Sequence, residues 1–129
     1  MIISEPRTAV PEHWREGVET RMLVSAQSGA SQLCVFEQLI APGAGAPTHR
    51  HPVEEVLTVR EGEAEIWLED ECLTLTAGQS VIVPARCPHG FRNRGAGTLH
   101  LHAVLASPIF EAVADGAAEV TRRWQASTA

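Results

Sequence analysis

Two histidines one residue apart, His49 and His51, precede two adjacent glutamates, Glu54 and Glu55, in the stretch PTHRHPVEEV. Imidazole nitrogen and carboxylate oxygen are common ligands of divalent metals. On a strand, successive side chains face opposite sides, so residues of equal parity share a face. This alternation groups Glu55 with the two histidines. It leaves Glu54 outside, as an exposed neighbour or a hydrogen-bonding partner of a ligand histidine.

A third histidine, His89, lies in PARCPHGFRN, on a short loop held by Pro84 and Pro88. Three imidazoles and one carboxylate form a mixed nitrogen and oxygen donor set, which suits Fe, Mn, Ni, Zn or Cu. Four protein ligands leave room for water or substrate on an ion that takes five or six, which is typical of a catalytic site. Taken alone, the His-x-His pair is also compatible with a solvated polar loop.

His100 and His102 share one face of a strand in GTLHLHAVLASP. If that face lines the interior, one of them can orient substrate or transfer a proton, and we count both with Glu55 as candidate catalytic residues. The opposite assignment places them on the outer surface, at a subunit contact. A single strand cannot determine which of its faces is buried.

Many short strands between Gly and Pro turns predict an all-β sandwich or barrel. EEVLTVREG and EAEIWLED flank Gly62, as the two strands of a hairpin do. The segment IFEAVADGAAEVTRRW is either a hairpin around Asp115 and Gly116 or a short amphipathic helix, and we favour the hairpin.

Composition limits the class of protein. A chain of 129 residues suits one domain. A net charge of -6 argues against a nucleic-acid partner, and no apolar run is long enough to span a membrane. The first residues lack the pattern of a signal peptide, and three cysteines, an odd number, favour reduced thiols. We therefore expect a cytoplasmic protein.

The segment GAGAPTHRHPVEEVLTVREG resembles the first motif of the cupin superfamily, G-x5-H-x-H-x3-E-x6-G. The matching residues are Gly43, His49, His51, Glu55 and Gly62.

The segment GQSVIVPARCPHGFRN resembles the second cupin motif, G-x5-P-x-G-x2-H-x3-N. Gly78, Pro84, His89 and Asn93 match this motif, whereas Arg86 stands where the pattern prefers glycine. That glycine usually serves a tight turn, so the loop is the one place where the chain departs from the pattern.

The resemblance implies a double-stranded β-helix, or jelly-roll barrel, of the RmlC-like type. The expected organisation is a single cupin domain over residues 1–129, with motifs at 43–62 and 78–93 and peripheral arms at 1–19 and 107–129.

The resemblance also implies one divalent metal ion held by His49, His51, Glu55 and His89, and a homodimer. We assign no residues to any other cofactor. The implied activity is that of a metal-dependent enzyme acting on a small organic molecule, most similar to quercetin dioxygenase and its small relatives. The alternatives are a metal-dependent isomerase or lyase and a non-catalytic protein that binds a small molecule, because cupins support all of these.

Overall fold

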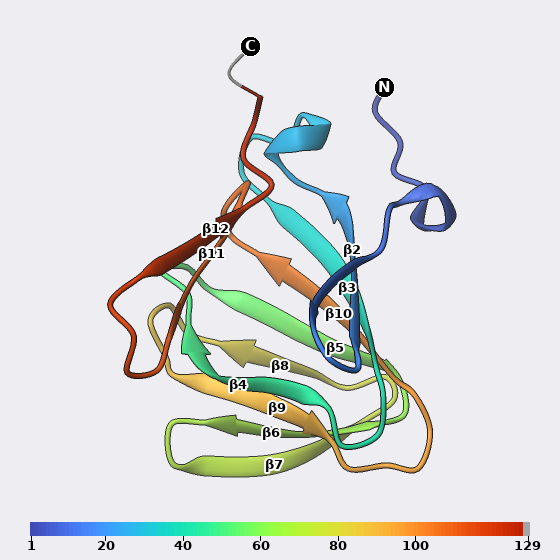
Figure 1. Ribbon diagram of the computed structural model, residues 1–129, viewed down its shortest axis with the longest axis vertical. Helices are drawn as coiled ribbons and strands as arrows, with labels where there is room; N and C mark the ends of the chain where they lie inside the picture. Colours follow the sequence, from blue (N-terminus) through green and yellow to red (C-terminus); the bar gives the residue numbers. More distant parts are fainter. Residues whose placement is uncertain (128–129) are drawn as a thin grey trace.

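Two six-stranded antiparallel sheets face each other in a computed structural model that describes residues 1–127 (Figure 1). Sheet A has the strand order β1-β2-β3-β10-β5-β8, and sheet B has the order β12-β11-β4-β9-β6-β7. The strands are β1 (Glu12–Arg15), β2 (Val18–Val24), β3 (Cys34–Ile40), β4 (Gly45–Arg50), β5 (Glu55–Glu61), β6 (Glu63–Leu68), β7 (Glu71–Thr76), β8 (Ser80–Val83), β9 (His89–Asn93), β10 (Leu99–Leu105), β11 (Phe110–Ala114) and β12 (Val120–Arg123). Two short 3-10 helices, Pro6–Thr8 and Ala26–Ser28, complete the described elements. The predicted all-β jelly roll is confirmed.

Strict alternation of side chains places the core between the two sheets. In β3 and β10 every second residue is buried. The two strands pair with Phe36 opposite Ala103 and Gln38 opposite Leu101, so these four side chains point into the barrel. The buried Gln38 amide donates a hydrogen bond to Thr20 Oγ1 at 2.9 Å, which satisfies a polar group in the core.

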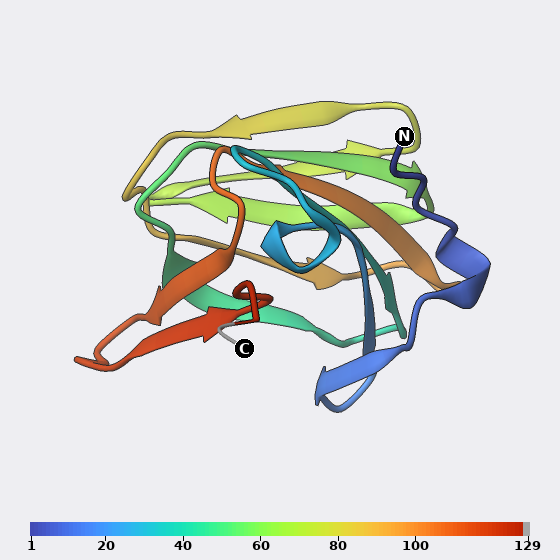
Figure 2. The same cartoon turned by 90° about the horizontal axis from the view of Figure 1, so that it is seen from above.

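The ends of the chain extend both sheets. β1 and β2 continue sheet A beside β3, and the β11–β12 hairpin continues sheet B beside β4 (Figure 2). The hairpin turns at Asp115 and Gly116, as the sequence predicted. Val18, Phe110 and Trp124 belong to the hydrophobic core. Much of the segments that we expected to be peripheral arms is therefore an integral part of the barrel.

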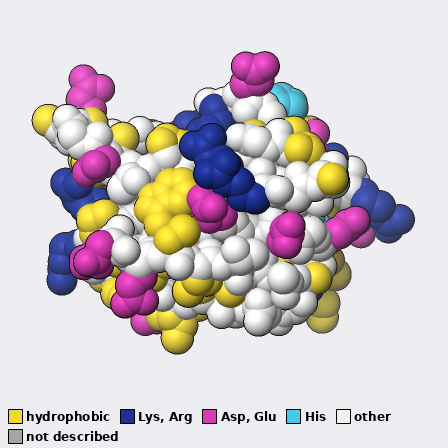
Figure 3. All heavy atoms as spheres, turned by 90° about the horizontal axis from the view of Figure 1, so that it is seen from below, with side chains coloured by type: hydrophobic (Ala, Val, Ile, Leu, Met, Phe, Trp, Pro, Cys, Tyr) yellow, Lys and Arg dark blue, Asp and Glu magenta, His cyan; other side chains and the backbone are white. Residues whose placement is uncertain are grey.

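The molecular surface carries charges of both signs. Figure 3 shows one face on which acidic and basic side chains are interspersed around a small hydrophobic patch. Within residues 1–127, no helix has the length and apolar character needed to cross a membrane.

Arg86 has a left-handed backbone conformation, with φ of 65°. It lies in the loop between β8 and β9, where the cupin pattern prefers glycine. Its backbone N–H donates to the His51 carbonyl at 2.7 Å, which ties this loop to the end of β4. The turn is thus retained without glycine, at a conformational cost of about 1–2 kcal/mol for an L-residue.

We expect the Arg86→Gly variant to be more stable than the Arg86→Ala variant by about 1 kcal/mol, because only glycine adopts this conformation freely. Both variants lack the arginine side chain, so the comparison isolates the backbone. Urea unfolding followed by tryptophan fluorescence measures the difference. Equal free energies of unfolding for the two variants would contradict a strained backbone at residue 86.

Candidate metal centre

Three histidines converge at one end of the space between the sheets. His49 on β4 and His89 on β9 are direct cross-strand partners, and their ring centroids lie 4.3 Å apart. His51 follows the end of β4, with its ring centroid 4.9 Å from that of His49. One ring nitrogen from each histidine can be chosen so that all three lie within 4.8 Å of one another. These three residues could hold a metal ion.

Backbone carbonyls orient all three imidazoles. The Nδ1–H groups of His49, His51 and His89 donate to the carbonyls of residues 47, 111 and 87 at 2.8, 2.8 and 2.9 Å. A carbonyl can only accept, so these hydrogen bonds place a proton on Nδ1 and leave Nε2 as the ligating atom. Such partners are typical of histidines that bind metals.

Glu55, the first residue of β5, points into the same space and is buried, whereas Glu54 is exposed. This orientation is the one that side-chain alternation predicted. Glu55 Oε1 lies 3.1 Å from His89 Nε2 and 3.5 Å from His51 Nε2. The carboxylate therefore adjoins two of the three histidines.

The electrostatics of the cluster favour an anionic carboxylate and a neutral His49. Burial raises the pKa of Glu55, but the adjoining imidazoles of His51 and His89 outweigh it and lower this pKa to about 2. Burial and the nearby His89 and His51 rings lower the pKa of His49 to about 4. The unprotonated imidazole of His49 is the form that can donate a lone pair to a cation.

The donor set fits a divalent ion. His51 Nε2 is buried and has no hydrogen-bond partner, which is costly unless something satisfies it. Metal–nitrogen bonds of about 2.0–2.1 Å require ligand nitrogens about 3–4 Å apart, so a small contraction of the cluster suffices. A cation placed among these side chains would lie beside both His89 Nε2 and Glu55 Oε1, which are 3.1 Å apart.

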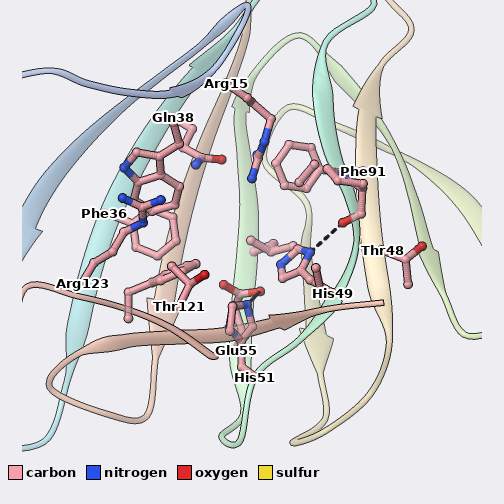
Figure 4. A pocket seen from close by; sticks show the side chains of 17 residues that line it. Arg15, Phe36, Gln38, Thr48, His49, His51, Glu55, Phe91, Thr121 and Arg123 are labelled. Carbon is pink, nitrogen blue, oxygen red and sulfur yellow. Dashed lines mark hydrogen bonds and ion pairs between the residues drawn. The ribbon is translucent and has the colours of Figure 1, made fainter. Parts of the chain in front are cut away.

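A cavity of about 130 Å³ opens from the cluster toward the barrel mouth. Figure 4 shows His49, His51 and Glu55 at one end, with Phe36 and Gln38 on the wall formed by β3. The cavity therefore joins the histidine cluster to a wall that is aromatic in part and polar in part.

Seven further cavity residues come from β1, β11 and β12, among them Trp14, Arg15, Phe110 and Arg123. Sequence reasoning did not identify them as site residues. The only signal is that EHWR and TRRW each combine arginine with tryptophan. Neither segment has a motif that would relate it to the histidines.

His100 and His102 lie on the outer face of sheet A, away from the cavity. Their neighbours on β10, Leu99, Leu101 and Ala103, point inward and are buried. His100 Nε2 lies 2.9 Å from Glu37 Oε2 on the same outer face. The expectation that these two histidines act in catalysis is therefore corrected in favour of the outer-surface alternative, because neither reaches the histidine cluster.

The comparison with known families identifies the class of protein. A family model described as a cupin domain matches residues 36–105, more than half of the chain. The chain therefore belongs to the cupin family, as the motifs predicted.

Two curated relatives share moderate identity with the chain. It is 28% identical over 110 residues to the HTH-type transcriptional regulator SutR of Escherichia coli, covering 82% of this chain and 62% of that protein. It is 33% identical over 88 residues to Protein SchB of Streptomyces halstedii, covering 67% of this chain and 64% of that protein. The chain thus spans less than two thirds of the length of either relative.

Solved structures share the fold. An RmlC-like cupin from Shewanella frigidimarina aligns with a TM-score of 0.71 and 25% identity, covering 82% of this chain and 89% of that one. The polyketide cyclase RemF from Streptomyces resistomycificus aligns with a TM-score of 0.74 and 20% identity, covering 96% and 86%. The Bacillus subtilis oxalate decarboxylase, for which Mn(II) centres are described, aligns with a TM-score of 0.77 and 20% identity. The alignment covers 84% of this chain and 30% of that one.

We expect His51→Ala to weaken the binding of Mn(II) or Zn(II) at least about 100-fold, because it removes one of three converging nitrogens. Glu54→Ala is the matched control, since Glu54 is exposed and directly precedes β5. Metal content after dialysis, measured by elemental analysis, and competition with a fluorescent chelator give the two affinities. Equal losses in the two variants would contradict the assignment of the inward face.

Proposed function

We propose that the protein is a metal-dependent enzyme acting on a small organic substrate, with one divalent ion held by His49, His51, His89 and Glu55. The orientation of three converging imidazoles by backbone carbonyls is the observation that carries this proposal. Such preorganisation holds a ligand set ready before the ion arrives. The adjoining cavity has room for a substrate next to the ion.

A bound divalent ion would supply Lewis-acid polarisation of a substrate oxygen and, if it is Fe, Mn, Cu or Ni, redox chemistry with O2. The chain's own residues bind and orient the substrate. Glu55 is anionic and lies at the inner end of the cavity, so it is our candidate acceptor for a substrate proton. Phe36, Phe91 and Phe110 line the cavity and exclude water from the reacting end.

Within this class we favour a dioxygenase-type oxidoreductase. Three histidines and one carboxylate leave open positions on an ion that takes five or six ligands, which substrate and O2 can share. The second candidate is a non-oxidative reaction, such as an isomerisation, a lyase reaction or a cyclisation. The similarity in fold to a polyketide cyclase, which extends over 96% of this chain, supports that candidate. Non-catalytic binding of a small molecule is the third.

Oxygen consumption separates these candidates. With Fe(II) or Mn(II) bound, we expect O2 uptake equimolar with the loss of a substrate drawn from a panel of small phenols, ketones and carboxylic acids. The same protein loaded with Zn(II), and the His51→Ala variant, should consume no O2. An oxygen electrode and chromatography of the products make the measurement. Conversion that proceeds equally with Zn(II) and without O2 would overturn the oxygenase and favour the second candidate.

We further propose a cytoplasmic homodimer. The free thiols Cys34, Cys72 and Cys87 are consistent with a reducing compartment. A row of apolar side chains crosses the outer face of sheet A through register partners, and it comprises Val24, Val35, Val104, Val56 and Ile82. An apolar row on a sheet face is typical of a protein–protein contact.

Ile82 ends this apolar row and is 63% exposed, so we expect Ile82→Glu to convert a dimer into a monomer at micromolar concentration. Leu73→Glu is the control, because Leu73 is also exposed but lies on β7 of the other sheet. Light scattering coupled to gel filtration measures the mass. A wild-type protein that is monomeric throughout would contradict the homodimer.

A further inference from the structure

Two arginines from opposite ends of the chain meet at the cavity. Arg15 is the last residue of β1, and Arg123 is the last residue of β12. Both line the cavity, and Figure 4 shows the Arg15 side chain extending into it from the side opposite His51 and Glu55. Burial and the charge of Arg123 lower the pKa of Arg15.

Neither arginine forms a salt bridge with a carboxylate within residues 1–127. Four other arginines, Arg7, Arg21, Arg94 and Arg122, each form a salt bridge with a glutamate. Arg15 instead donates to a backbone carbonyl, that of Gly45, at 3.3 Å. Arg123 lies over the Trp14 ring, with Cζ 4.0 Å from the ring centroid, and its buried Nε has no hydrogen-bond partner.

The nearby carboxylate of Glu12 is already engaged. Its two oxygens accept hydrogen bonds from the indole N–H groups of Trp14 and Trp124, at 3.0 and 2.8 Å. Glu12 thus binds both tryptophans, and its charge also acts on Arg123, whose pKa burial lowers and Glu12 raises. Two guanidinium groups that line one cavity without a salt bridge among residues 1–127 can take a carboxylate from a ligand.

The space between the arginines and the histidines has the shape of a small aromatic slot. Trp14, Phe36 and Phe110 pack against one another, with ring centroids 4.8–6.1 Å apart. Phe110 also meets His51, with centroids 5.3 Å apart. A cavity of about 130 Å³ is close to the size of one that binds benzene, about 150 Å³.

We propose that this cavity selects a small planar carboxylate, whose carboxyl group is held by Arg15 and Arg123 and whose unsaturated body lies against Trp14, Phe36 and Phe110. The opposite end of such a molecule faces the histidine cluster. Guanidinium groups match a carboxylate with two parallel hydrogen bonds, which fixes orientation as well as affinity. The inference rests on the proposed function only in naming the reacting end, since the binding of the carboxylate needs no metal.

Benzoate and its neutral isostere benzamide are the probes. We expect benzoate to bind the full-length protein at least about tenfold more tightly than benzamide, as expected for a charge-assisted pair. Arg15→Gln and Arg123→Gln should each abolish this preference while changing benzamide binding little. Arg94→Gln, which removes the same charge from the outer face of sheet B, should keep it. Isothermal titration calorimetry or ligand-observed NMR gives the dissociation constants.

Each titration is run on metal-free and on Zn(II)-loaded protein. A preference for benzoate that survives removal of the metal and depends on the arginines supports the proposal. A preference that appears only with Zn(II) and is unchanged by Arg15→Gln would place the carboxylate on the metal and overturn it. Equal binding of the two probes would overturn it as well. If Arg123→Gln fails to fold, as thermal melting would reveal, the exposed Arg15→Gln variant carries the test. None of these outcomes depends on oxygen chemistry.

Discussion

The pairing of β4 with β9 is the constraint on which the site depends. It sets His49 directly opposite His89, with the register shifting between Ala46 and His49. Because side chains alternate along a strand, a slip of one residue would turn one of these imidazoles out of the barrel. The hydrogen bond from the Arg86 N–H to the His51 carbonyl links the loop before β9 to the end of β4, and so supports the same register.

The strands at the two ends of the chain contribute to the site together with the central strands. The Glu111 carbonyl on β11 orients His51 across 60 residues of sequence, so the C-terminal hairpin takes part in shaping the histidine cluster. β1 and β12 bring Trp14, Arg15 and Arg123 to the mouth of the cavity. The end of the cavity that holds the histidine cluster therefore comes from the family motifs, and the mouth comes largely from segments outside them.

The cavity thus combines residues of the cupin motifs with residues that lie outside those motifs. The cupin motifs define a donor set that supports many reactions, so they say little about the substrate. Charge and shape at the cavity mouth are more selective, because a guanidinium group there favours a ligand that carries an anionic group. The aromatic cluster around Phe110 then sets the size and planarity of what can reach the histidines.

The sequence by itself determined the all-β class, the C-terminal hairpin and the inward face of Glu55, because these follow from alternation, turn residues and motif spacing. It left open which face of β10 is buried, since His100 and His102 alternate with apolar residues that could also have been outward. Only the tertiary structure decided that both histidines point away from the cavity. It alone placed Arg15 and Arg123 at the same cavity, because side-chain contacts over more than 100 residues, such as Arg123 over Trp14, join two ends that no local pattern connects.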